Sequence, residues 1–196
     1  MQAIVTIENL TIAFTSMYGK NYAVRDLSLQ IPRAKTLGLV GESGCGKSVT
    51  AYSLLQLVPK PGVIEKGAIM YNTLNLLQCP DATLQSIRGK NISMIFQEPM
   101  TSLNPVFTIG YQVQEAVELH LHLQKAEAKD YTIALLGKAG IPSPSSRYYS
   151  YPHELSGGLR QRAMIAMALA AKPELLIADE PTTALDVTIQ SQILDL

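Results

Sequence analysis

The sequence GESGCGKSVT at residues 41–50 carries the clearest signal in the chain. Gly41, Gly46, Lys47 and Ser48 satisfy the pattern G-x-x-x-x-G-K-[ST]. An apolar run, TLGLV, precedes it and a helix-favouring run follows it, which is the strand–loop–helix context that such a phosphate-binding loop requires. The sequence therefore predicts a phosphate cradle formed by Gly41, Glu42, Ser43, Gly44, Cys45, Gly46, Lys47, Ser48 and Val49.

The chemistry of this loop follows from its residue types. Glycines let successive backbone N–H groups converge on phosphate oxygens, and the start of the following helix adds partial positive charge. Lys47 would supply a point charge to the β- and γ-phosphates, and the Ser48 hydroxyl would ligate Mg²⁺. Cys45 is expected to be a small filler, although a thiol beside a lysine and a helix N-terminus could be reactive. The alternative reading is a glycine-rich turn with an exposed lysine.

The overall composition excludes several classes of protein. The chain has 196 residues, of which 16 are basic and 16 acidic, so it lacks the clustered positive charge expected of a nucleic-acid-binding protein. Its longest apolar run, AMIAMALAA at 163–171, is far shorter than the roughly 20 residues that span a bilayer. The N-terminus does not resemble a secretory signal. Cys45 and Cys79 lack metal-ligand spacing, which indicates a reducing, cytosolic compartment.

Hydrophobic periodicity predicts an α/β protein. Residues 4–10 and 22–31 are expected to form an antiparallel pair, and 36–40 a buried central strand. The remaining expected strands are 67–72, 92–96 and 174–178, and the expected helices are 47–58, 81–88, 108–123, 125–139 and 158–171. Residues 141–152 are expected to be a proline-stiffened loop. The segment 186–196 begins a helix without a closing glycine, cap or strand, which suggests a truncated chain.

An acidic pair follows the last expected strand. The sequence LLIADEP at 175–181 places Asp179 and Glu180 after an apolar run. Ligands of open α/β sheets bind beyond the carboxyl ends of the strands. Asp179 is therefore expected to hold Mg²⁺, directly or through water, and Glu180 to polarise an attacking water as general base. The alternative is a solvated strand end before Pro181.

A second possible anion site lies at residues 155–162, LSGGLRQR. A serine and two glycines at the start of a helix can approach a phosphate closely. One nucleotide needs one cradle, so a second cradle makes sense if it serves a nucleotide held by a partner.

These motifs together resemble the ATP-binding cassette (ABC) ATPases over essentially the whole chain. In the family's order, residues 41–48 match Walker A, Gln97 the glutamine loop, 155–158 the LSGG signature, Asp179–Glu180 the end of Walker B, and 184–186 the D-loop. The stretches IFQEPMTSLNP and ADEPTTALDVTIQSQIL further resemble the branch that serves peptide and nickel importers. Leu159 stands where that branch more often has Met or Gln.

The resemblance implies an architecture. It implies a P-loop NTPase core with a RecA-like parallel sheet, an N-terminal antiparallel β-subdomain and an inserted helical subdomain, with the C-terminal part missing. A single ABC ATPase domain would then occupy residues 1–196. Its nucleotide-binding core would be 1–97 and 171–196, and about 98–170 would form the helical signature subdomain.

The resemblance also implies roles and partners. ATP and Mg²⁺ would be the cofactors, with Ser48, Gln97 and Asp179 at the metal and Glu180, Gln97 and Lys47 in catalysis. The partner would be a second cassette, identical or paralogous. Ser156, Gly157 and Gly158 would bind the γ-phosphate of the nucleotide that this partner holds, and Asp186 would help couple the two sites. The Gln97 loop and the helical insert would contact membrane permease subunits at the cytoplasmic face of a bacterial inner membrane.

Two expectations remain open. An aromatic residue of the N-terminal hairpin would stack on adenine, and Phe14 fits the spacing best, with Tyr18 and Tyr22 as rivals. The family's switch histidine follows Walker B, and His120, His122 and His153 do not match its position, so they are expected to be packing or surface residues. The alternatives to a transporter ATPase are therefore a nucleotide-binding fragment without hydrolysis and a soluble ABC ATPase unconnected with transport.

Overall fold

The computed structural model describes residues 2–17, 19–98 and 102–181. Contacts between residues divide the chain into two compact units, Met1–Ser86 and Ile87–Leu196. Each unit has a sheet of its own. The predicted division into a core of 1–97 and 171–196 with a helical subdomain between them stays a prediction.

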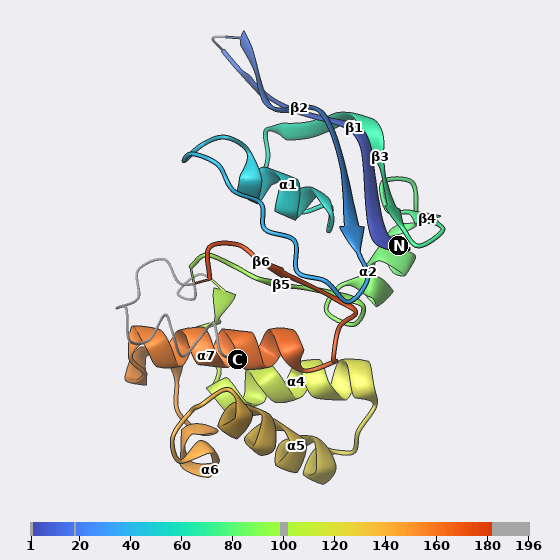
Figure 1. Ribbon diagram of the computed structural model, residues 1–196. Coiled ribbons are helices and arrows are strands. Elements are labelled where there is room, and N and C mark those ends of the chain that lie inside the picture. The colour runs from blue at the N-terminus through green and yellow to red at the C-terminus, as the bar shows by residue number, and fades with distance from the viewer. Residues whose placement is uncertain (1, 18, 99–101, 182–196) are drawn as a thin grey trace. The chain divides into compact units, whose positions relative to one another are not determined.

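An antiparallel sheet of strand order β2-β1-β3-β4 forms the first unit (Figure 1). Its strands are β1 (Ala3–Ser16), β2 (Gly19–Pro32), β3 (Gly62–Tyr71) and β4 (Leu74–Asn75). Central β1 buries an apolar row that includes Val5, Ile7 and Ile12. The predicted pairing of 4–10 with 22–31 is confirmed, with Thr6 opposite Gln30.

Two short helices accompany this sheet, α1 (Lys47–Ser53) and α2 (Asp81–Ile87). The first ends five residues before the predicted Val58, because Gln56 adopts a left-handed conformation with φ 51°. The third strand begins at Gly62 instead of 67, because its first residues already pair with β1, where Gly62 lies opposite Phe14.

The prediction of a buried central strand at 36–40 is wrong for this structure. These residues form no strand, and Leu39 and Val40 are 46% and 94% exposed. An apolar run favours burial but does not specify its neighbours, and a parallel strand is stable only when adjacent strands supply hydrogen bonds. Within the described ranges the only parallel partners are β5 and β6.

The second unit contains that parallel pair, β5 (Ile92–Ile95) and β6 (Leu175–Ala178). Ile92 lies opposite Leu175 and Ile95 opposite Ala178, so the two strands end level with each other. Both strands were predicted. The second strand is only partly buried, since Leu176 is 38% exposed.

Among the described residues of this unit the α-helices are α4 (Ile109–Leu121), α5 (Lys125–Lys138), α6 (Pro144–Arg147) and α7 (Gly157–Leu169). Three of them, α4, α5 and α7, pack together (Figure 1) and were predicted. The short α6 and a 3₁₀ turn (Pro152–Glu154) lie within the segment expected to be loop.

Helix α7 is buried on two sides. Ala163 and Ala166 join an apolar cluster with residues of α4 and α5, among them Val113 and Leu136. Met164, Ile165 and Ala168 pack with Ile95 of β5. Helix α7 therefore connects the helical layer to β5.

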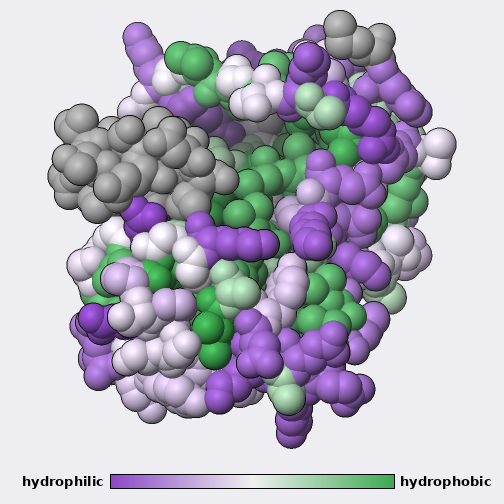
Figure 2. Space-filling model, turned by 60° about the horizontal axis from the view of Figure 1, so that its bottom comes forward, coloured by the Kyte–Doolittle hydropathy of each residue, from purple (hydrophilic) through white to green (hydrophobic). Residues whose placement is uncertain are grey.

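The surface carries both polar and apolar residues. In Figure 2, hydrophilic and hydrophobic residues are interspersed over the face shown. Among the residues described, no helix is both long and apolar enough to cross a membrane.

Candidate functional site

The predicted phosphate loop leads into α1 through a left-handed glycine. Gly46 has φ 97° and is the N-cap of α1, and Gly44 has φ 80°. A Cβ on Gly46 would lie 2.4 Å from the carbonyl oxygen of Ala23 in β2. Glycine is therefore required at position 46 both by backbone conformation and by the close approach of β2.

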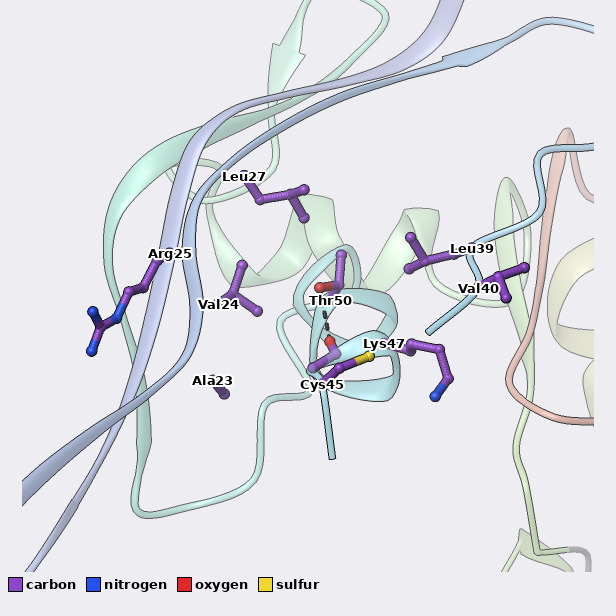
Figure 3. Close-up of a pocket in the computed structure, with 10 residues that line it drawn as sticks. Ala23, Val24, Arg25, Leu27, Leu39, Val40, Cys45, Lys47 and Thr50 are labelled. Atoms are coloured by element: carbon purple, nitrogen blue, oxygen red, sulfur yellow. Dashed lines mark hydrogen bonds between the residues drawn. The ribbon is translucent and has the colours of Figure 1, made fainter. Parts of the chain in front are cut away.

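The Lys47 side chain folds back onto the start of this loop. Its Nζ donates hydrogen bonds to the carbonyl oxygens of Gly41 (2.9 Å) and Glu42 (3.0 Å). One turn later, both the backbone N–H and the Oγ1 of Thr50 donate to the Gly46 carbonyl at 2.9 Å, which fixes the first turn of α1 (Figure 3). The ammonium group is thus held within the loop, where phosphate oxygens could replace the two carbonyls as its partners. Ser48, the predicted Mg²⁺ ligand, is half-buried in that turn.

A cavity of about 270 Å³ adjoins the loop. Its lining residues are Ala23, Val24, Arg25, Leu27, Leu39, Val40, Cys45, Gly46, Lys47 and Thr50. Its volume is just below the usual range of small-molecule pockets, and the Arg25 side chain points away from Lys47 (Figure 3). The phosphate-binding role of the loop and Lys47 stays a prediction.

The aromatic residues of the hairpin differ in their surroundings. Phe14 is half-buried, and a Cβ on Gly62 would come within 2.8 Å of its ring. The Tyr22 ring has the Arg25 guanidinium 4.6 Å and the Lys20 ammonium 5.3 Å from its centroid. Tyr18 lies outside the described residues. Neither Phe14 nor Tyr22 is among the cavity-lining residues, and the adenine contact of Phe14 stays a prediction.

In the second unit, the level ends of the parallel strands bring two predicted residues into contact. Gln97 follows β5 and Glu180 follows β6, and the Nε2 of Gln97 donates a hydrogen bond to Oε2 of Glu180 at 2.9 Å. Asp179, only 5% exposed, extends the strand pairing through its backbone N–H to the Ile95 carbonyl at 3.0 Å. A carboxylate, a buried acid and an amide thus share one end of the strand pair, which is where α/β sheets bind ligands.

The conformation of Glu180 is unusual. Its φ is 45°, in the left-handed region, where residues with a Cβ are uncommon and which is often strained at functional sites. Its side chain is exposed, whereas that of Asp179 is buried. The turn after β6 therefore exposes the carboxylate of Glu180 to solvent and keeps the carboxylate of Asp179 buried.

The signature residues form the N-terminus of α7. Ser156 is the N-cap, and its Oγ accepts a hydrogen bond from the Leu159 N–H at 3.4 Å. Ser156 and Gly157 are exposed, and a Cβ on Gly157 would contact nothing within 4 Å. The start of this 13-residue helix is open to a ligand, as an anion site requires.

One polar contact of this helix was not expected from the sequence. The Nε2 of Gln161, a residue only 2% exposed, donates to the carbonyl oxygen of Pro181 at 2.7 Å. In the sequence Gln161 stands between Arg160 and Arg162, so no local signal distinguishes it from an exposed polar residue.

The histidines occupy packing and surface positions, as expected. Burial, followed by the positive charge of Lys90 and the neighbouring His122, lowers the pKa of His120 below its usual value. His122 is the left-handed C-cap of α4, and the His153 ring stacks on Tyr151 with centroids 5.5 Å apart. Asp186 lies outside the described residues.

Comparison with known proteins gives consistent matches. The family described as "ABC transporter" matches residues 24–183. The dipeptide transport ATP-binding protein DppD of Bacillus subtilis (strain 168) is 47% identical over 197 residues, which cover 100% of this chain and 59% of the relative. The oligopeptide transport ATP-binding protein OppD of the same organism is 47% identical over 194 residues, covering 98% of this chain and 54% of the relative. The chain thus spans a little over half the length of these relatives.

A solved structure matches the fold. The ATP-binding cassette MJ0796, in a dimeric post-hydrolysis state bound to ADP and Pi, superimposes with a TM-score of 0.85 at 26% identity, covering 97% of this chain and 80% of that one.

Proposed function

This chain belongs to the ABC transporter family of ATP-binding proteins, and from that premise we propose that it is the ATP-binding and ATP-hydrolysing subunit of a bacterial peptide importer. The observation that carries the hydrolytic part is the hydrogen bond between Gln97 and Glu180 at the end of the parallel strands. The similarity to DppD and OppD supports peptides as the transported class; nickel is the alternative cargo.

The phosphate loop would hold the nucleotide. Backbone N–H groups of residues 41–48 and the Lys47 ammonium would neutralise the β- and γ-phosphates, and the two loop carbonyls that now accept from Lys47 would release it to the ligand. Phe14 would stack on adenine, a contact that contributes about 1–3 kcal/mol for a base on an aromatic ring.

Hydrolysis would follow from the pair after the strands. Glu180 would accept a proton from water as the water oxygen bonds to the γ-phosphorus and the bond to the leaving ADP oxygen breaks. Gln97 would orient that water and restrain the Glu180 carboxylate. Products would be ADP and phosphate, and the proton would pass from Glu180 to solvent.

Mg²⁺ would be bound by hard oxygen donors. In the described part of the chain no cluster of three His, Cys, Asp or Glu side chains could hold a metal. Mg²⁺, however, is typically held by one or two carboxylates together with substrate phosphates and water, and the Ser48 hydroxyl, the Asp179 carboxylate and the Gln97 amide are donors of that kind. The ion would neutralise charge on the phosphates.

A second cassette would complete each site. MJ0796 is dimeric in its ADP-bound structure. By analogy, Ser156, Gly157 and Gly158 would bind the γ-phosphate held by the partner, and Asp186 would help couple the two sites. The open N-terminus of α7 supports this assignment.

The subunit would lie at the cytoplasmic face of the inner membrane as a peripheral protein. Its Gln97 loop and helices within 98–170 would contact the permease subunits. The competing functions are a nucleotide-binding protein without turnover and an ABC ATPase unconnected with transport.

Nucleotide binding and hydrolysis by the intact protein separate these functions. The wild type should bind and hydrolyse ATP, Lys47→Ala should lose tight binding, and Glu180→Gln should bind ATP but hydrolyse it at least about 100-fold more slowly. Turnover of Glu180→Gln at the wild-type rate would exclude Glu180 as the base. ATP binding without hydrolysis by the wild type would favour the non-catalytic alternative.

A further inference from the structure

The turn that carries Glu180 is held by side chain and backbone contacts from three sides. On one side, the Asp179 N–H bonds to the Ile95 carbonyl at 3.0 Å. On the second, Gln97 donates to the Glu180 carboxylate at 2.9 Å. On the third, the Gln161 amide donates to the Pro181 carbonyl at 2.7 Å.

Of the two side-chain contacts with this turn, the one from Gln161 is the more deeply buried. Gln161 is 2% exposed, and a hydrogen bond lost there leaves a carbonyl and its former partner shielded from water, which is more costly than the loss of an exposed bond. The Gln161 amide bonds to Pro181, the residue directly after Glu180. Glu180 has a left-handed φ of 45°, a conformation that requires support from its surroundings.

We propose that Gln161 is a positioning residue for Glu180: its amide holds the Pro181 carbonyl and thereby the turn that directs the Glu180 carboxylate. Gln161 itself touches neither water nor phosphate in this role. The inference rests on the proposed function of Glu180 as the base.

The bond from Gln161 to Pro181 also connects the helix that begins at Ser156 with the turn that carries Glu180. Gln161 lies in the second turn of α7, the helix whose N-cap is Ser156, about 7–8 Å along the axis from that cap. Further along, Met164 and Ile165 pack with Ile95, at the end of the strand that leads to Gln97. A displacement of α7 when Ser156 engages the partner's nucleotide would therefore move the Pro181 carbonyl, and with it Glu180.

The first experiment compares two glutamine-to-methionine variants in the intact protein. Gln161→Met keeps side-chain length but removes the donor to Pro181. Gln114→Met is the matched control, because the Gln114 amide donates to Glu118 and Lys125 within the helical layer and not to the turn at 179–181. We expect Gln161→Met to bind ATP with an unchanged Kd and to lose about 10- to 100-fold in kcat, and Gln114→Met to stay within about twofold of the wild type.

A second variant separates positioning from general destabilisation. In Gln161→Glu, a protonated carboxyl can donate to the Pro181 carbonyl as the amide does, whereas an ionised carboxylate can only accept and repels it. The ratio of its kcat to that of the wild type should therefore rise as the pH is lowered from about 8 to about 6. A ratio that does not change with pH, together with equal kcat values for the two methionine variants, would overturn the proposal.

A readout without turnover distinguishes this inference from the proposed function. With ¹³C-labelled glutamate, the Glu180 carboxyl resonance, assigned through Glu180→Gln, should shift in Gln161→Met and not in Gln114→Met. If the resonance does not shift, the positioning role fails even where Glu180 proves to be the base. If the resonance shifts in Gln161→Met but the wild-type protein does not hydrolyse ATP, the proposed function fails and the positioning contact stands.

Discussion

Gln97 and Glu180 are 83 residues apart in sequence, yet the Nε2 of Gln97 lies 2.9 Å from Oε2 of Glu180 and donates a hydrogen bond to it. The contact exists because β5 and β6 are parallel and end at the same level, Ile95 opposite Ala178. Each residue follows its strand by two positions, so both side chains leave the pair at one end. A proposed base and a proposed water-orienting amide are thus adjacent.

Removal of this amide should slow hydrolysis without preventing nucleotide binding. Gln97→Ala deletes the donor to Glu180, and the loss of one preorganised polar group typically lowers kcat by about 10²–10³-fold. Steady-state ATPase rates and ATP affinity of the intact protein measure both effects. Gln124→Ala is the control, because Gln124 is exposed at the N-cap of α5 and its side chain makes no capping bond. Equal rates for the two variants would contradict a role for Gln97 in turnover.

Gly46 should tolerate no side chain. Gly46→Ala places a Cβ 2.4 Å from the Ala23 carbonyl oxygen and in a backbone conformation of φ 97°, so we expect a loss of about 1–3 kcal/mol in the free energy of unfolding. Gly44→Ala is the matched comparison, since Gly44 has φ 80° but its Cβ would meet nothing within 4 Å. Urea unfolding should show a larger loss for Gly46→Ala than for Gly44→Ala. Similar losses would mean that the approach of β2 does not constrain the loop.

Ser156 has two separable tasks, the capping of α7 and the proposed contact with a partner's phosphate. Ser156→Asp retains a good N-cap but introduces negative charge where phosphate would bind. Its free energy of unfolding should stay within about 0.5 kcal/mol of the wild type, while ATP hydrolysis that depends on dimer formation should be lost. Thr108→Asp makes the same change at the N-cap of α4, where Thr108 accepts from the Tyr111 N–H, and should preserve both properties. Wild-type hydrolysis by Ser156→Asp would argue against a phosphate contact.

His120 should make stability depend on pH. Its pKa is lowered in the folded protein by burial, by Lys90 and by His122, so the unfolded chain binds a proton more readily. The folded protein is therefore most stable above the unfolded pKa of about 6.5. Its free energy of unfolding decreases as the pH falls below that value, because the unfolded chain then takes up a proton. Unfolding midpoints between pH 7.5 and 5.5 should therefore decline less in His120→Gln than in the wild type. Lys90→Met, which removes a repelling charge, should also weaken the decline; an unchanged decline in both variants would refute this origin.

Much of the local structure could be predicted from the sequence, because the signals are local. The antiparallel pair β1–β2, both parallel strands and helices α4, α5 and α7 follow from hydrophobic period and from glycine, proline and capping residues. The proposal of a phosphate-binding loop at 41–48 likewise rests on its glycines and Lys47, which let backbone N–H groups and a positive charge surround phosphate.

Other features depended on neighbours that no local pattern specifies. The run at 36–40 reads as a buried strand, yet Val40 is 94% exposed. Gln161 stands between two arginines in the sequence, yet its amide is buried and donates to the carbonyl of the residue after Glu180. Both outcomes depend on which segments pack beside these residues.

By itself, then, the sequence determined which residue types could bind phosphate and activate water, because backbone freedom, charge and acidity belong to individual residues. Only the tertiary structure decided which of them meet. The level ends of β5 and β6 bring Gln97 to Glu180, and the two-sided burial of α7 brings Gln161 to Pro181. Such meetings arise from strand register and side-chain packing between segments distant in sequence, which set the distances on which hydrogen bonding depends.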